Sequence, residues 1–458
     1  MEHWPGWLQS LMSVHITSGP LYTGIWLTTI IGLAALLIWQ VLRTDRRRAW
    51  WQLLGAAAPG GAGLLVAWLL SDVFMVFGVS LGWAVIRGIA VGFAMIGFLG
   101  VTVAHARAWR RAVAIALIPV ALVATAMHVD SIYGEYQTIG SLFNYSPYPS
   151  IRKSRKTTAK TTVKQWRRLA ETGRLPELPA AGKLFTTSID NTNSGFAARD
   201  AIVYLPPAAL SDDPPALPVM VMLAGQPGSP NRFFTASGIV PMLDAYAAAH
   251  DGLAPIVVSP DQNGAATINS LCADTTKHGN AETYLTQDVN DWIRAHLPVA
   301  TAPSAWTIGG FSQGGTCSTQ LGPRHPDQYG NVLAVDGEIE PTAGSVDEMV
   351  RDYFGGDRSA YEAQVPVNAI ADHAPSDQTM ILAAGGNDEK SVGNVRTIGK
   401  AARKAGMTVV TLTVPGTGHD WHAVNAVLEA SLPWLCARMG LGSTDKTWKD
   451  YPKVSELL

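Results

Sequence analysis

Four long apolar segments in the first 130 residues constrain this chain more than any other feature. A single α-helix needs about 20 consecutive apolar residues to cross the hydrocarbon core of a bilayer. One segment contains Pro59-Gly60-Gly61, a break that a membrane helix tolerates when its neighbours satisfy the freed backbone groups. The segments are Leu21–Leu42, Trp51–Leu70, Trp83–Ala104 and Ala112–Val129. Residues 1–130 are therefore predicted to form an all-α transmembrane domain of four helices.

The loops between these segments predict how the domain is oriented. Short cytoplasmic loops carry an excess of Lys and Arg. Neither the stretch before Leu21 nor the loop Ser71–Gly82 contains either residue. The other two loops hold several arginines, namely Arg43, Arg46, Arg47, Arg48, Arg107, Arg110 and Arg111. We therefore expect a multi-pass protein of the cell membrane, with the residues after the fourth segment outside the cytoplasm.

Residues 131–182 are expected to form a juxtamembrane linker, which contains a strongly basic stretch. Its cationic residues are Arg152, Lys153, Arg155, Lys156, Lys160, Lys164, Arg167 and Arg168. One interpretation is a solvated connection with no partner. The other is contact with anionic lipid headgroups, which attract basic segments close to a membrane.

From about Lys183 the pattern changes to short β-rich runs that alternate with helical stretches. Helices are expected at Ala281–His296, Val395–Ala405 and Trp421–Cys436. The expected strands are Leu184–Ile189, Ala201–Leu205, Val219–Leu223, Ile256–Ser259, Trp306–Ile308, Val332–Val335, Met380–Ala383 and Val409–Val414. Such alternation is typical of an α/β domain with a mostly parallel sheet. Because no helix separates the first two strands, they predict an antiparallel edge, and residues 183–458 are expected to form one catalytic domain.

Charge and cysteine content exclude two classes of function. The net charge of −2 gives no electrostatic reason to expect a nucleic-acid partner. Cys272, Cys317 and Cys436 form no CxxC motif and no cluster with histidine. No zinc site, other metal or cofactor is therefore expected.

The motif Gly310-Phe311-Ser312-Gln313-Gly314 carries the clearest chemical signal. It matches G-x-S-x-G and lies between an expected strand and a helical stretch, as in the nucleophile elbow of α/β hydrolases. The chain turns so sharply there that a side chain at either flanking position would clash, which explains the glycines. Ser312 is therefore predicted to be a nucleophile raised above the sheet.

A serine hydroxyl needs a general base, and in this fold an acid and then a histidine follow the nucleophile along the chain. His419 lies in a glycine-bearing loop after the last expected strand and is the predicted base. His422 is a nearby rival, but it falls within the helical stretch that follows.

The acid should follow the preceding strand, which ends at Gly385-Gly386-Asn387-Asp388-Glu389. Asp388 is our choice, in the role of holding the imidazole tautomer and stabilising the imidazolium. Glu389 is the nearest alternative. Asp336 is a third candidate, because some hydrolases take their acid from the strand before.

An oxyanion hole requires two backbone N–H groups directed at the developing charge. One is expected from Gln313, directly after the nucleophile. The other is expected from the loop Ala224–Gly228, where Gln226 is favoured and Pro227 cannot donate.

Two cysteines lie in segments that we expect near the carboxyl end of the sheet. Cys272 follows the strand Ile256–Ser259, and Cys317 lies five residues beyond Ser312. We predict a disulfide between them, which would persist in an oxidising compartment. The alternative is a pair of buried thiols. Cys436 is expected to remain unpaired.

From about Ala201 to Leu435 the domain resembles the esterase D and antigen 85 (mycolyltransferase) group of α/β hydrolases. The resemblance rests on the elbow followed by Gly315, on Val203–Pro207, on Tyr353–Asp357 and on Gly418-His419-Asp420-Trp421. It implies ester cleavage or acyl transfer without metal or cofactor, through the serine, the histidine and the loop residue Gln226. Antigen 85 proteins differ in using a glutamate as the acid and an Asp-Gly pair in the oxyanion loop, where this chain has Ala224-Gly225. That difference disfavours a trehalose mycolyltransferase.

These observations predict a membrane-anchored serine esterase or acyltransferase that acts outside the cytoplasm on a lipid or cell-envelope ester. Its Ser-His-Asp triad would work through an acyl-enzyme intermediate. Transfer of a mycolyl or other acyl group to an envelope carbohydrate is an alternative. A binding module on a hydrolase scaffold is another, which the complete set of triad candidates disfavours. A transporter or sensor is a weak hypothesis, because only Asp72 and Arg87 offer polar chemistry in the membrane domain.

Overall fold

The computed structural model describes residues 5–43, 46–74, 76, 80–151 and 158–457. Much of the basic stretch, at residues 152–157, lies outside the described residues. The chain divides into two compact units, one of residues 1–145 with the short segment 418–421, the other of residues 146–417 with 422–458. The division after Tyr145 falls within the stretch that we expected to be a linker.

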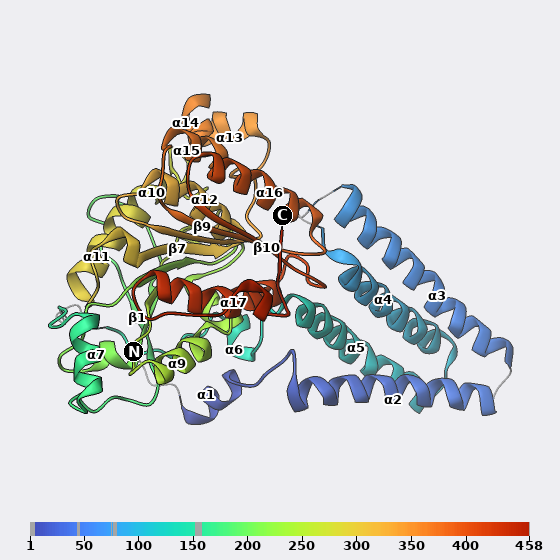
Figure 1. The fold of residues 1–458 in the computed structure, drawn as a ribbon. Coiled ribbons are helices and arrows are strands. Elements are labelled where there is room, and N and C mark those ends of the chain that lie inside the picture. Colours follow the sequence, from blue (N-terminus) through green and yellow to red (C-terminus); the bar gives the residue numbers. More distant parts are fainter. Residues whose placement is uncertain (1–4, 44–45, 75, 77–79, 152–157, 458) are drawn as a thin grey trace. The chain divides into compact units, whose positions relative to one another are not determined.

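Among its described residues, the N-terminal unit contains four helices that are long and apolar enough to cross a membrane (Figure 1). They are α2 (Gly19–Arg43), α3 (Arg46–Trp68, continued by the π-helical turn η1, Leu69–Val73), α4 (Gly82–His105) and α5 (Trp109–Tyr133). Two short helices, α1 (Gly6–Met12) and α6 (Ile139–Leu142), flank them in the sequence. Pro59 lies inside α3 without ending it.

Glycines allow α3 and α4 to approach each other closely. A Cβ atom at Gly97 of α4 would lie 2.5 Å from Cγ of Pro59 and would also collide with the carbonyl oxygen of Gly55. A Cβ at Gly60 would lie 3.0 Å from that of Ala94. Small residues at helix contacts are typical of membrane proteins, where van der Waals packing replaces the hydrophobic effect.

The second unit is built on a nine-stranded sheet with the order β1-β2-β4-β3-β7-β8-β9-β10-β11. Within this order, the run β4-β3-β7-β8-β9-β10 is parallel, while β1, β2 and β11 pair antiparallel with their neighbours. Their bounds are β1 Lys183–Thr187, β2 Ala201–Leu205, β3 Val219–Leu223, β4 Ile256–Ser259, β7 Trp306–Phe311, β8 Asn331–Val335, β9 Thr379–Gly385, β10 Thr408–Val414 and β11 Ser455–Glu456. The predicted mostly parallel sheet with an antiparallel edge is confirmed, and β11 adds a second such edge that we did not predict.

Helices cover both faces of this sheet (Figure 1). On one face lie α12 (Gln313–Arg324) and α16 (Glu389–Lys404), and on the other α9 (Ile239–Ala249) and α17 (Trp421–Arg438). Every residue of β3 and of β7 is buried, as expected for parallel strands covered on both sides. The remaining elements are α7 (Val163–Glu171), η2 (Pro207–Leu210), α8 (Pro230–Ala236), β5 (Asp274–Thr275), β6 (Gly279–Asn280), α10 (Ala281–Thr283), η3 (Tyr284–Asp288), α11 (Val289–His296), η4 (Pro303–Ala305), α13 (Val346–Asp352), α14 (Arg358–Glu362), α15 (Pro366–Asp372) and η5 (Trp448–Asp450).

Two boundaries near the candidate site differ from those expected. Strand β7 continues to Phe311, so that it ends directly before Ser312. Helix α16 begins at Glu389 rather than Val395, because Asp388 caps its first turn by accepting a hydrogen bond from the Ser391 N–H. The first difference places Ser312 directly after the strand, and the second places Asp388 at the start of a helix.

Candidate active site

Ser312 occupies the sharp turn between β7 and α12. Its backbone has φ +57° and ψ −119°, and its N–H donates to the carbonyl oxygen of Val335 at 2.9 Å. A positive φ is costly for a residue with a side chain, and such strain persists where the surroundings enforce it, often at functional sites. Ser312 therefore has the backbone conformation of a nucleophile elbow.

Neighbouring strands explain the glycines that flank this serine. A Cβ at Gly310 would lie 2.5 Å from the carbonyl oxygen of Leu223, and one at Gly314 would collide with the same carbonyl group. A Cβ at Gly315 would lie 2.8 Å from the carbonyl oxygen of Val335. Adjacent strands thus leave no room for side chains on either side of the turn.

The loop after β3 lies against the elbow. A Cβ built on Gly225 would be 3.4 Å from the Ser312 Cβ, which places the next residue, Gln226, close to the nucleophile. Within the described part of the chain, neither the Gln226 N–H nor the Gln313 N–H donates a hydrogen bond. The Gln313 N–H also belongs to the first turn of α12, where the helix dipole favours negative charge. Their role as oxyanion donors stays a prediction.

His419 lies in the loop after β10, and two carboxylates lie close to it. Asp336, Asp388 and His419 each offer an atom within 4.8 Å of the others. The loops after β9 and β10 are joined by a hydrogen bond of 2.8 Å from the Asn387 N–H to the carbonyl oxygen of Thr417. A carboxylate beside an imidazole can fix its tautomer, and the same three groups could also ligate a metal ion.

The two carboxylates are held differently. Asp388 accepts hydrogen bonds from the Ser391 N–H at 3.1 Å and from its hydroxyl at 2.7 Å. Asp336 is fully buried, has φ +50°, and accepts a hydrogen bond of 2.8 Å from the N–H of Gly385. The other two candidates, Glu389 on the first turn of α16 and His422 on α17, are exposed. Asp388 and Asp336 thus remain as candidates for the acid.

The predicted disulfide between Cys272 and Cys317 is present, with the two Cα atoms 5.7 Å apart. It connects the long loop after β4 to the elbow helix α12. Cys436 is buried outside any disulfide, as expected. Burial raises the pKa of its thiol well above the ordinary value, so this cysteine is not suited to act as a nucleophile.

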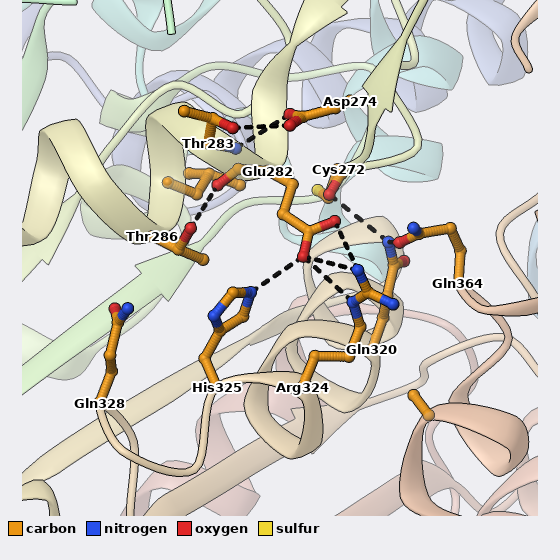
Figure 2. Close-up of polar contacts among 12 residues, drawn as sticks. Cys272, Asp274, Glu282, Thr283, Thr286, Gln320, Arg324, His325, Gln328 and Gln364 are labelled. Carbon is orange, nitrogen blue, oxygen red and sulfur yellow. Dashed lines mark hydrogen bonds and ion pairs between the residues drawn. The ribbon is translucent and has the colours of Figure 1, made fainter. Parts of the chain in front are cut away.

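A second polar cluster lies at the far end of α12, about 18 Å along the helix axis from Ser312. Figure 2 shows the carboxylate of Glu282 in contact with Arg324 and His325. These residues line a cavity of about 430 Å³. The shortest contacts of the carboxylate are 3.0 Å to Arg324 and 2.9 Å to His325. Burial opposes ionisation of Glu282, but these partners outweigh it and hold the pKa of the carboxyl below its ordinary value. The cluster fixes the C-terminal end of the helix that begins at the nucleophile.

Sequence reasoning missed several buried polar residues after β4. Asp261 forms an ion pair with Arg199, and Gln262, Asn263 and Asn269 surround the side chain of Gln313. The run Pro260-Asp261-Gln262-Asn263 directly follows a buried strand. Polar residues in that position could have been recognised as part of the site, because parallel strands carry their sites at their carboxyl ends.

A family model described as "Putative esterase" matches residues 197–434 of this chain. The match contains the elbow, both candidate acids and the His419 loop. The chain belongs to this esterase family. It is also 32% identical over 429 residues to an uncharacterised protein of Corynebacterium glutamicum, an alignment that covers 91% of this chain and 96% of that protein. The resemblance drawn from the motifs and the α/β-hydrolase fold class are thereby confirmed.

Solved structures similar to this esterase-family chain include two kinds of hydrolase. One is a ferulic acid esterase, with 18% identity, a TM-score of 0.44, and coverage of 57% of this chain and 99% of that one. Another is an S-formylglutathione hydrolase from Agrobacterium tumefaciens, with 17% identity, a TM-score of 0.47, and coverage of 58% and 98%.

Proposed function

We propose that this protein is a membrane-anchored serine esterase or acyltransferase with Ser312 as its nucleophile. The observation that carries the proposal is the positive φ of Ser312 at a strand-to-helix turn, within a domain of the esterase family. A strained elbow with glycines on both sides raises the serine oxygen at the start of a helix, as a nucleophile requires.

In the proposed reaction, Ser312 Oγ attacks the carbonyl carbon of an ester while His419 takes up its proton. Asp388 orients the imidazole and stabilises its charged form. The N–H groups of Gln226 and Gln313 stabilise the oxyanion of the tetrahedral intermediate. The alcohol then leaves with the proton and an acyl-serine remains. Water, or an acceptor hydroxyl, attacks this ester and restores Ser312.

The substrate that we propose is a lipid or cell-envelope ester on the outer side of the membrane. The two arginine loops support this orientation by the positive-inside rule, and the disulfide is of a kind that persists in oxidising compartments. Anchoring raises the effective concentration of substrates in the same membrane. In this arrangement the basic stretch Arg152–Arg168 contacts anionic headgroups.

A charged fluorophosphonate that cannot cross membranes tests nucleophile and orientation together. Intact cells expressing the full chain should be labelled at Ser312, and Ser312→Ala should abolish both labelling and hydrolysis of a chromogenic ester. Loss of one triad member typically costs several powers of ten in rate. Ser318→Ala is the matched control, since this buried serine lies on the same helix and its hydroxyl only donates to the carbonyl oxygen of Gly314.

Two results would contradict the proposal. Ester hydrolysis by Ser312→Ala near the wild-type rate would remove the nucleophile assignment. Labelling that appears only after the cells are lysed would reverse the orientation.

A further inference from the structure

The side chain of Gln313, next to the nucleophile, has every hydrogen-bonding group occupied. Its amide nitrogen donates to Oδ1 of Asn263 at 2.8 Å and to Oδ1 of Asn269 at 2.7 Å. Its amide oxygen accepts from Nδ2 of Asn263 at 2.7 Å and from Nε2 of Gln262 at 3.4 Å. A glutamine has two donors and two acceptor positions, so this network fixes the residue whose N–H is a proposed oxyanion donor.

Gln262 is placed where it joins the two loops that supply those donors. Its Nε2 donates to the carbonyl oxygen of Ala224 at 2.7 Å as well as contacting Gln313. Ala224 lies two residues before Gln226, the other proposed donor. The Gln262 side chain is only 3% exposed. One buried amide therefore connects the end of β3 to the start of α12.

The loop that carries Gln262 is itself rigidly held. Asp261 is fully buried, forms an ion pair of 2.7 Å with Arg199, and accepts a hydrogen bond from the Asn263 N–H at 3.1 Å. Farther along the loop, the disulfide from Cys272 reaches α12. Because this loop is held near both ends, we expect the Gln262 side chain to keep a fixed position against the residues that it contacts.

We propose that Gln262 is a positioning residue that sets the width of the oxyanion hole, an inference that rests on the proposed function. Oxyanion donors must lie about 2.7–3.1 Å from the oxygen, and loss of one costs about 10²–10³-fold in kcat. Releasing the amide that joins both loops lets the two donors separate. Because the oxyanion exists only in the transition state and the intermediate, this changes kcat rather than KM.

The test compares Gln262→Met with a matched variant of another buried glutamine. Gln378 also donates from Nε2 to two acceptors, the carbonyl oxygens of Gly322 at 2.8 Å and Tyr329 at 2.6 Å. Gly322 lies in the last turn of α12 and Tyr329 follows that helix, so both acceptors lie at the end of α12 opposite Ser312. In the full-length protein, Gln262→Met should lower kcat for a chromogenic ester by about 10–100-fold with KM little changed. Affinity for a boronic acid, which mimics the tetrahedral intermediate, should fall in parallel. Gln378→Met should alter neither value.

Gln262→Glu keeps the side-chain shape and serves if the methionine variant does not fold. Its ionised carboxylate cannot donate to Ala224, whereas the protonated acid can. The ratio of its kcat to that of the wild type should therefore rise as the pH is lowered.

Each outcome has a distinct meaning. If the wild type is active and Gln262→Met retains a kcat within twofold of it, the positioning role alone is overturned. The same holds if Gln378→Met lowers kcat as much as Gln262→Met does. A kcat ratio for Gln262→Glu that does not depend on pH would do the same. A wild type that neither hydrolyses esters nor reacts with a fluorophosphonate would overturn the proposed function together with this inference.

Discussion

Large apolar side chains face outward on helices α2–α5 but inward in the esterase domain. On α2, Leu27, Ile30 and Ile31 are 52%, 54% and 63% exposed, whereas every residue of strand β3 is buried. In water, exposure on the scale of the four helices would be unfavourable, and a bilayer removes the cost. The two regions are therefore suited to different solvents.

The same difference governs how each region achieves specific packing. In lipid, helices would gain nothing from burying one apolar surface against another, and α3 and α4 instead approach each other closely at Gly55 and Gly97. The esterase domain gains from burial, and this gain can offset the desolvation of charged pairs such as Asp261 with Arg199. Stability thus depends on small residues in one region and on an apolar core with paired polar groups in the other.

Asp388→Asn should give the largest effect and should be confined to the esterase domain. Asparagine caps a helix as well as aspartate does, so α16 should remain intact. The wrong imidazole tautomer should lower kcat by about 10⁴-fold, measured with a chromogenic ester. Asp336→Asn is the comparison, since its amide oxygen can still accept from Gly385, and a much smaller fall is expected. If the two effects were reversed, Asp336 would be the acid.

Gly97→Val should destabilise the helical region by about 3 kcal/mol, the upper part of the range for overpacking, because its neighbours include a backbone carbonyl that cannot move aside. Thermal unfolding in detergent, followed by size-exclusion chromatography, measures the change. Gly100→Val on the same helix is the control, since a Cβ there meets nothing within 4 Å. Hydrolysis of a soluble ester should be unchanged in both variants. A parallel fall in kcat for Gly97→Val would show that the two regions are energetically coupled.

Glu282→Gln should give the smallest effect. We expect it to lower the free energy of unfolding by about 1.5–3 kcal/mol at neutral pH, because hydrogen bonds to charged groups are weakened. The pKa of Glu282 is lowered in the folded state from an ordinary value of 4.5. Its stabilising contribution is therefore complete above that value and is lost as the pH falls through the folded-state pKa. The variant should lose less stability than the wild type over that acid range, measured by the unfolding temperature. Glu362→Gln, at an exposed site on α14, should behave like the wild type, and an identical acid response in Glu282→Gln would exclude this role.

Much of the fold could be predicted because its signals are local. Helices α2, α4 and α5 follow from unbroken apolar length, and eight strands of the sheet follow from short apolar runs bounded by turn residues. Strand β11 was not predicted, because two residues carry too little pattern. The short helices α13–α15 between β8 and β9 were missed for a similar reason.

The sequence by itself determined the elbow at Ser312. Its signal is local, because a sharp turn between a strand and a helix leaves no room for side chains beside the serine, and the glycines that this requires lie within five residues. The sequence also determined the candidate base, because His419 follows the final long strand. Only the tertiary structure decided which carboxylates lie near His419 and which amides surround Gln313. Those groups are separated by tens of residues, and their distances depend on how parallel strands align at one edge of the sheet. Gln262 is the clearest case. Its side chain contacts residues 38 and 51 positions away, and no local pattern encodes such a pairing, because it arises only when β3, β4 and β7 lie together in the sheet.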